Sequence, residues 1–136
     1  MAVGLGILPN ATWTVTDKGS WTANGITGEG EEFASYGTNL CIADTTPQSG
    51  GYSTPSLQSC GANGTVWVAC SNGDGYFLYD RFFLNQGGGS DNVDQLGVAL
   101  SSGQRVLQMV NENYASAAWF IRWQFPIPGP TPPACS

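Results

Sequence analysis

Few side chains in this sequence could support catalysis. The chain of 136 residues contains no histidine, so the Ser–His and Cys–His pairs that activate many nucleophiles are absent. A glycosidase needs only two carboxylates, about 5 to 9.5 Å apart, and the sequence offers five aspartates as candidates: Asp44, Asp74, Asp80, Asp91 and Asp94. Aspartate is common in turns and solvated loops without a catalytic role. We therefore predict that the protein is not an enzyme.

The four cysteines could bind a metal or form disulfides. They are separated by 19, 10 and 65 residues, whereas structural zinc usually takes close C-x2-C pairs. Disulfides are favoured, and no metal or other cofactor is expected. Cys41 and Cys60 each end a strand-like run, and the loop between them can turn back, which favours this pair and leaves Cys70 for Cys135. Four cysteines allow three pairings, and two bridges in any of them imply an oxidising compartment.

One glycine-rich loop carries oxygen ligands that calcium could use. In the stretch GGGSDNVDQ, Asp91, Asn92 and Asp94 could each supply an oxygen. A complete calcium loop usually supplies six or more oxygens, with a further carboxylate downstream. This stretch stops short, so we predict a hairpin loop and no metal site.

The charge of the chain excludes several classes of partner. Its 4 lysines and arginines stand against 10 aspartates and glutamates, a net charge of −6. No basic run could neutralise a phosphate backbone or an anionic membrane, so neither is an expected partner. No apolar run approaches the ~20 residues of a membrane helix. The opening MAVGLGILPN lacks the basic region of a signal peptide, so we expect a secreted or virion-surface protein whose signal peptide is not in this chain.

Strand patterns separated by glycine, asparagine and proline turns recur along the chain. Residues 12–16 alternate aromatic and β-branched side chains with threonine, and residues 119–125 alternate most clearly. At most one short helical turn is expected, at residues 114–117. The predicted strands are 12–16, 20–23, 32–36, 38–43, 56–59, 65–70, one from 76, 95–100, 105–110 and 119–125. So many short strands indicate a β-sandwich or jelly roll, or a closed barrel.

A weak internal repeat favours the barrel. Aligning Trp67 with Trp119 superposes a hydrophobic trio, a variable loop and an alternating strand, with a period of about 52 residues. A third, shorter copy would occupy residues 1–35, around Trp13 and Trp21. We predict an all-β fold, a β-trefoil of about twelve short strands over residues 1–125. The Pro-rich tail, residues 126–136, would be tethered by the second disulfide.

Three short motifs in the middle of the chain resemble the R-type, ricin-B-like lectin family. They are LCIAD at residues 40–44, LQSC at 57–60 and NGTVW at 63–67. The family repeat begins with Leu-Cys-Leu-Asp, closes a disulfide about twenty residues later and ends with Gln-x-Trp. The match is good over about thirty residues and loose from Leu78 to Trp123. Ala43 occupies the family's Asp position, and Thr65 replaces its Gln.

The resemblance implies a non-catalytic, extracellular carbohydrate-binding domain. A sugar needs an aromatic face for its C–H surface, and a carboxylate and amides for its hydroxyls. By resemblance these are Tyr52, Asp44, Gln58 and Asn63, whereas Trp67 and Trp119 are expected in the core. The expected partner is a carbohydrate or glycoprotein. One shallow site would bind weakly, so several copies or fusion to another domain would be needed.

Two other functions fit the same sequence. The low charge and aromatic residues suit a structural or adhesive subunit of a virion or cell surface, associating with a larger assembly. The loop at residues 46–55 could instead serve as the rigid exposed loop of a protease inhibitor.

Overall fold

The described residues form β-strands joined by turns and contain no helix. A computed structural model describes residues 2–4, 12–23, 26–44, 55–62, 64–73, 75–80, 95–101, 103–110, 118–119, 123–125 and 127–135. The described strands are β1 (Ala2–Gly4), β2 (Thr12–Ala23), β3 (Ile26–Ser35), β4 (Leu40–Ala43), β5 (Ser56–Ser59), β6 (Val66–Asn72), β7 (Gly75–Asp80), β8 (Gln95–Ser101), β9 (Gln104–Val110) and β10 (Ala118–Trp119). In this part of the chain no helix is long and apolar enough to cross a membrane.

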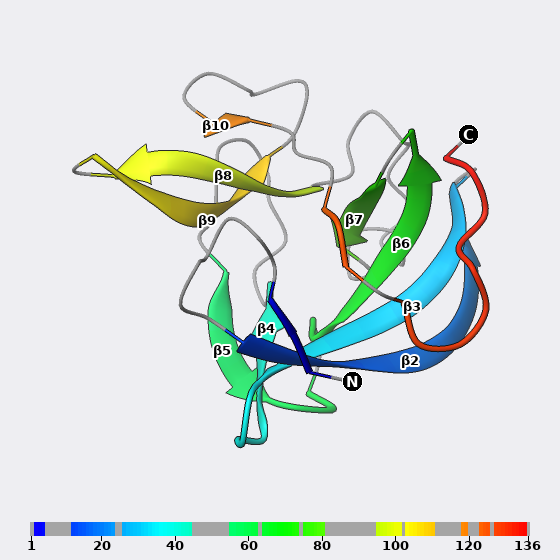
Figure 1. Ribbon diagram of the computed structural model, residues 1–136, viewed down its shortest axis with the longest axis horizontal. Coiled ribbons are helices and arrows are strands. Elements are labelled where there is room, and N and C mark those ends of the chain that lie inside the picture. The colour runs from blue at the N-terminus through cyan, green and yellow to red at the C-terminus, as the bar shows by residue number, and fades with distance from the viewer. Residues whose placement is uncertain are drawn as a thin grey trace.

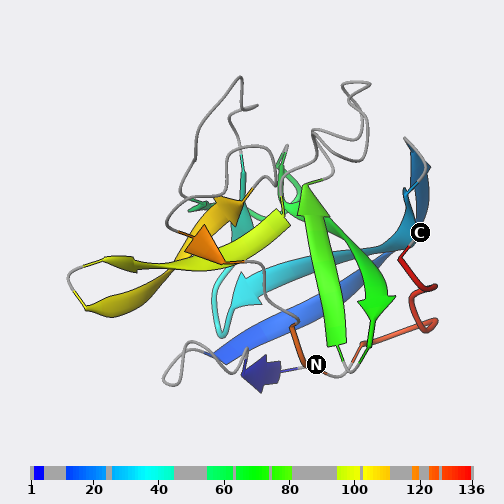
Figure 2. The ribbon, with the colours of Figure 1, turned by 90° about the horizontal axis from the view of Figure 1, so that it is seen from above.

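The strands form one continuous, curled antiparallel sheet. Its main path runs β1-β2-β3-β6-β7-β8-β10, with β4 paired to β3, β5 to β4 and β9 to β8. Figure 1 shows the long strands β2 and β3 curving around the body, followed by β6 and β7. The β8–β9 hairpin extends away from the body in Figure 1 and in the view from above in Figure 2.

The β2–β3 hairpin curves because β2 contains an irregularity. The register with β3 shifts between Asp17 and Ser20, where Gly19 has a φ of 91° and donates its N–H to Asp17 Oδ1 at 3.2 Å. A positive φ is easily adopted by glycine, and an irregularity of this kind bends the strand that contains it. The predicted strands 12–16 and 20–23 are therefore one strand.

The inner face of the curled sheet carries the hydrophobic core. Side chains alternate along each strand, and the core cluster takes every second residue from several strands. It consists of Trp13, Val15, Phe33, Ile42, Trp67, Ala69, Leu78, Leu96, Trp123 and Phe125, with Tyr76, Leu107 and Ile127 packed against it. Phe33 and Phe125 meet edge to face at 5.3 Å between ring centroids, so the segment that leads into the tail helps to close the core.

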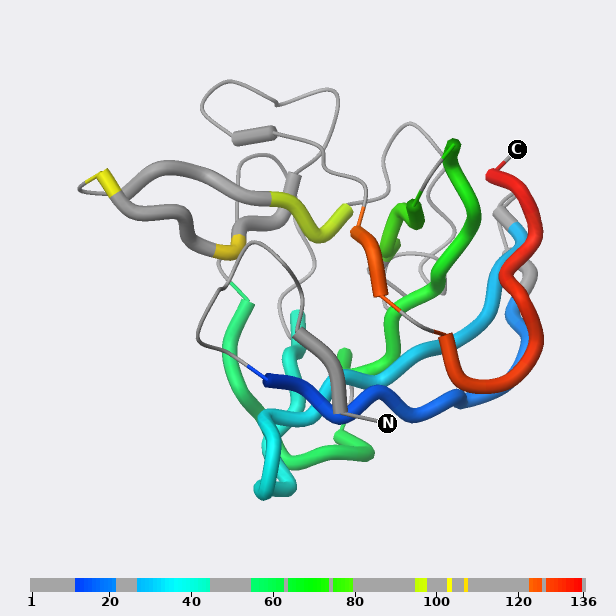
Figure 3. Tube along the Cα trace, in the orientation of Figure 1, coloured from blue at the N-terminus to red at the C-terminus, as the bar shows by residue number. Residues whose placement is uncertain are grey.

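The C-terminal tail lies along the outer end of β2 and β3. Figure 3 follows it as the red tube that curves around this end. Ser71 in β6 holds the tail through its N–H to Pro133 O at 2.7 Å and its hydroxyl to Pro132 O at 2.9 Å. The Cys70–Cys135 disulfide adds a covalent link. The tail is thereby fixed to the edge of the sheet, with Gly129 against Asp17.

The structure confirms part of the sequence analysis. The all-β class holds throughout the described residues, and both predicted disulfides are present. The strand predicted at 119–125 is described only at its two ends, as β10 and as a bridge between Trp123 and Tyr76. Trp67 is a fully buried core residue, as predicted. The helical turn at 114–117 and the glycine-rich loop with Asp91, Asn92 and Asp94 lie outside the described residues.

Candidate functional site

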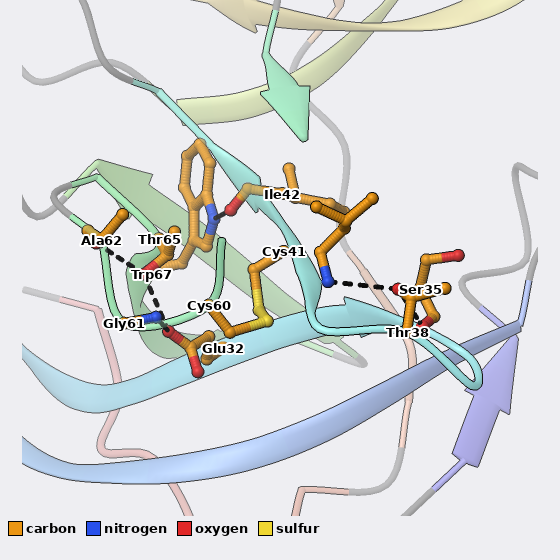
Figure 4. The surroundings of a disulfide bond; sticks show 11 residues. Glu32, Ser35, Thr38, Cys41, Ile42, Cys60, Gly61, Ala62, Thr65 and Trp67 are labelled. Carbon is orange, nitrogen blue, oxygen red and sulfur yellow. Dashed lines mark hydrogen bonds between the residues drawn. A yellow bond between two sulfur atoms is a disulfide. The ribbon is translucent and has the colours of Figure 1, made fainter. Parts of the chain in front are cut away.

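The β4–β5 hairpin and the turn after it form a lobe braced by a disulfide. In the hairpin, Leu40 pairs with Ser59 and Ala43 with Ser56. Cys41 in β4 is bonded to Cys60, the first residue of the turn, with 5.0 Å between their Cα atoms. The turn is therefore linked back to the strand that begins the lobe (Figure 4).

The same turn is held from below by the carboxylate of Glu32. Glu32 lies in β3 and is 7% exposed. Its Oε2 accepts the N–H of Gly61 at 2.9 Å and the hydroxyl of Thr65 at 2.7 Å, as Figure 4 shows. Hydrogen bonds to an ionised acceptor are stronger than neutral ones. Glu32 is thus a structural residue of the lobe, and the sequence analysis did not identify it.

Asp44, the predicted sugar acceptor, lies where β4 meets this turn. It is buried, and its N–H donates to Gly64 O at 3.1 Å. Gly64 has a φ of 84°, and a Cβ there would collide with the carbonyl oxygen of Asp44. Glycine is required here for both reasons. The close approach brings Asp44 against the turn in whose sequence Asn63 lies.

Gln58, the predicted amide partner, lies elsewhere on the lobe. It sits in β5 opposite Cys41, and its Nε2 donates to Ser56 Oγ at 3.1 Å. Asp44 is three residues beyond Cys41, which corresponds to about 10 Å along a strand. The structure therefore does not bring Gln58 beside Asp44. The other two predicted site residues, Tyr52 and Asn63, lie outside the described residues, as does the loop 46–55 except for Pro55.

A small apolar cavity opens beside the β4–β5 hairpin. It has a volume of about 130 Å³ and is lined by Trp13, Ile42, Pro55, Ser56, Leu57 and Leu107. Leu57, on its wall, is 46% exposed, and Leu40, on the same hairpin, is 43% exposed. Exposed aliphatic side chains beside an apolar hollow favour contact with an apolar group. The sequence analysis did not predict this cavity, because its walls come from four strands that are distant in sequence.

Three tryptophans of the core can be compared by the hydrogen bond of the indole N–H, and one of them differs from the other two. Trp67 Nε1 donates to Ile42 O in β4 at 3.0 Å, and Trp123 Nε1 donates to Leu96 O in β8 at 2.8 Å. Trp13 Nε1 is buried and has no hydrogen-bond partner among the described residues. The equivalent of Trp67 by hydrogen bonding is therefore Trp123. The sequence analysis had aligned Trp67 with Trp119.

Two buried glutamates form an acidic group on the inner face of β3. Glu29 lies opposite Ser20 and Glu31 opposite Asp17. The Ser20 hydroxyl donates to Glu29 Oε1 at 2.8 Å, whereas Glu29 Oε2 and both Glu31 oxygens are buried without a hydrogen-bond partner among the described residues. Burial raises the pKa of Glu31 to about 8, with the negative charges of Asp17 and Glu29 adding to the effect.

A signal for this acidic group was present in the sequence. Glu29, Glu31 and Phe33 are two residues apart in one strand, so alternation places all three on one face. Since Phe33 is a core residue, the two glutamates had to point inward as well.

A metal site is not formed by the one group of candidate ligands in the described residues. Ligand atoms of Glu32, Cys41 and Cys60 lie within 4.8 Å of one another. Because the two sulfurs are bonded to each other, neither is available as the thiolate that a metal would require.

Comparisons with known proteins do not identify a relative. No family model, curated protein or solved structure matches the chain. The chemistry of the site therefore rests on its own residues: a buried aspartate at the edge of a rigid lobe, and an apolar cavity beside the same hairpin.

Proposed function

We propose that the protein is a non-catalytic, extracellular carbohydrate-binding domain with a β-trefoil arrangement. Sugar would bind at the rim of the β4–β5 lobe, with Asp44 as acceptor and Asn63 and Tyr52 as further contacts. The observation that carries the proposal is the position of Asp44 against the turn of residues 60–65, since the resemblance assigns sugar contacts to both.

A repeated unit supports the trefoil arrangement. In the first unit, β3 and β6 pair with each other and enclose the hairpin β4–β5. In the second, β7 bridges to Trp123, and the hairpin β8–β9 lies between them in sequence. Each unit ends with a tryptophan that donates to the first strand of its own hairpin. Repetition of one supersecondary unit around a shared core is the sequence and structural mark of a repeat fold.

The spacing of the tryptophans extends the repeat to the start of the chain. Trp13 precedes Trp67 by 54 residues, and Trp123 follows Trp67 by 56 residues. Trp13 belongs to the same core cluster as the other two. In this arrangement β2 is the last strand of a third unit, for which the described residues contain no hairpin of its own.

Two further observations support binding without catalysis outside the cell. Both disulfides are of the kind that persists in an oxidising environment. Burial raises the pKa of Glu31, whose side chain is 0% exposed. A group so enclosed cannot reach a substrate from solution, so its shifted pKa is a consequence of folding.

A glycan array followed by calorimetry tests the proposal. We expect weak binding of the parent protein to at least one class of glycan, with avidity on a multivalent surface. Replacement of Asp44 by Asn should weaken binding about ten-fold or more, because a desolvated acceptor for sugar hydroxyls loses its charge. Tyr52→Ala should weaken it through loss of a stacking surface.

Matched controls separate a local effect from unfolding. Asp17→Asn makes the same chemical change in the middle of β2, outside the β4–β5 lobe, and should leave glycan binding unchanged, with thermal melting used to verify the fold of each variant. If the folded parent binds no glycan in either assay, the proposal is wrong.

A structural or adhesive role is the second candidate, favoured by the surface of the same lobe. Leu40, Leu57 and Tyr36 are large exposed apolar side chains, and β5 pairs only with β4 in the described sheet. An apolar surface beside an unpaired strand edge is suited to contact with another protein chain. Light scattering tests this role: a stable oligomer that dissociates on Leu40→Lys, in a protein that binds no glycan, would support it.

A further inference from the structure

Trp13 differs from its two counterparts in one property, the absence of an acceptor for its indole N–H. Trp67 and Trp123 each donate to a main-chain carbonyl in the first strand of a hairpin. Trp13 is 7% exposed and its Nε1 has no hydrogen-bond partner in the described part of the chain. A buried donor without an acceptor is rare, because it has lost water and gained nothing in exchange.

The apolar cavity lies beside this same tryptophan. Its walls come from β2 (Trp13), from the β4–β5 hairpin (Ile42 and Leu57) and from β9 (Leu107). It therefore lies between the two hairpins of the repeated unit and the strand that would end the third unit. Trp13, whose indole N–H is unsatisfied among the described residues, therefore also lines the apolar cavity. In the trefoil arrangement a third hairpin would pack here.

Two strands beside the cavity, β5 and β9, each have one edge that pairs with no other strand of the described sheet. In the described sheet β5 pairs only with β4, and β9 only with β8. Each leaves a row of main-chain donors and acceptors for an additional strand. Leu57, at 46% exposure, stands at the side of the cavity.

We propose that this cavity is a docking site for an extended peptide segment of a partner protein. The segment inserts an aliphatic side chain between Ile42, Leu57 and Leu107, and one of its main-chain carbonyls accepts the Trp13 indole N–H. Trp13 Nε1 is covered in the unbound protein. The incoming strand therefore displaces the atoms that cover Nε1 and supplies a hydrogen-bond acceptor, which those atoms do not. The proposal rests on the trefoil arrangement above but does not depend on sugar binding.

The chemistry of the site selects a peptide over other ligands. The acceptors of the two counterpart indoles are main-chain carbonyls, and addition of a strand to a free edge is a common mode of peptide recognition. In that mode main-chain hydrogen bonds supply affinity, and a pocket for one side chain supplies specificity.

Selection from a phage-displayed library of random twelve-residue peptides tests the proposal. The library is selected on the full chain and counter-selected on Leu57→Lys, which places a charge at the cavity wall. Leu40→Lys is the matched control, because Leu40 is similarly exposed on the same hairpin but does not line the cavity. Selected peptides should share an aliphatic residue and bind the parent and Leu40→Lys alike, but Leu57→Lys at least about ten-fold more weakly.

Nuclear magnetic resonance of the indole N–H groups supplies a second readout. Trp13→Phe identifies the Trp13 signal, which a selected peptide should shift while leaving the Trp67 and Trp123 signals in place. Failure to select any peptide that distinguishes the parent from Leu57→Lys overturns the proposal, and so does binding that leaves the Trp13 signal unchanged. Asp44→Asn should leave peptide binding intact, so failure of the sugar proposal and failure of this one are separate results.

Discussion

Glu31 and Glu32 are adjacent in β3, are both buried, and differ in almost every other respect. Glu32 faces the β4–β5 lobe and accepts hydrogen bonds from Gly61 N–H and the Thr65 hydroxyl. Glu31 faces the core, and neither of its carboxylate oxygens has a hydrogen-bond partner among the described residues. A buried carboxylate is tolerated where donors meet it, and where none does its neutral form is favoured.

The difference between the two sites follows from where main-chain donors are free. Inside a ladder of strands the N–H groups are already bonded to neighbouring strands. Glu31, opposite Asp17 on one side and Trp67 on the other, therefore meets only side chains. The turn after β5 is not part of a ladder, so it can direct the N–H of Gly61 toward Glu32.

The largest expected effect concerns the disulfide of the C-terminal tail, which packs against Asp17, the residue opposite Glu31. Replacing Cys70 and Cys135 by serine opens a loop with a sequence separation of 65 residues, which should lower the free energy of unfolding by about 4 kcal/mol. Urea denaturation measures this loss. Removal of Cys41 and Cys60, 19 residues apart, should cost about 3 kcal/mol; the reverse order would show that loop length does not control the two contributions.

Removing the satisfied carboxylate should be costly. Glu32→Ala leaves the Gly61 N–H and the Thr65 hydroxyl without their acceptor, and we expect a loss of about 3 kcal/mol in unfolding free energy. Glu32→Gln, which keeps an acceptor oxygen, should lose clearly less. Equal losses in the two variants would mean that packing, and not hydrogen bonding, stabilises the turn.

Removing the unsatisfied carboxylate should have the opposite sign and depend on pH. The pKa of Glu31 is about 8 in the folded protein against 4.5 as its ordinary value, so the unfolded chain releases this proton first. Its contribution to stability therefore falls as pH rises from about 4.5 to 8 and is constant outside this window. Glu31→Gln should match the parent near pH 4 and be more stable by about 3 kcal/mol at pH 7, because the unfolded parent has by then lost the proton that the folded parent keeps.

Denaturation curves across pH 4 to 9 provide the measurement for Glu31. The difference between parent and variant removes the contributions of all other titrating groups. A difference that does not change with pH would show that Glu31 is not the group whose pKa is raised.

The smallest expected effect concerns Glu29, which, unlike Glu31, has a hydrogen-bond donor among the described residues. Ser20 donates to Glu29 Oε1 at 2.8 Å, so Ser20→Ala should cost about 1 kcal/mol. Ser56→Ala, which removes only the contact to Gln58, is a matched control and should be nearly neutral.

Local patterns in the sequence predicted much of the fold. The alternation at 12–16 marked the part of β2 that carries Trp13 and Val15 into the core, and the cysteine positions led to the two observed disulfides. Alternation and turn residues act over a few neighbours, so they can be read directly from a sequence.

The site was less predictable because it combines distant segments. Asp44 and the turn of residues 60–65 share one neighbourhood, as the sequence motifs suggested, but Gln58 lies further along the hairpin. Glu32, 29 residues before Gly61, was missed because no local pattern links a strand residue to a turn so far along the chain. The cavity beside Trp13 was missed because four strands must be assembled before it exists.

The amino-acid sequence by itself determined the all-β class and the positions of most strands, because these depend on alternation and turn chemistry; it favoured the cysteine pairing that the structure shows but left three pairings open. Only the tertiary structure decided which buried polar groups are satisfied. Positions 31 and 32 carry the same side chain, yet the packing of other segments supplies hydrogen-bond donors to Glu32 and, among the described residues, none to Glu31. The same is true of Trp13 compared with Trp67. Folding brings a carbonyl within reach of the Trp67 indole N–H, whereas the Trp13 indole N–H has no acceptor among the described residues.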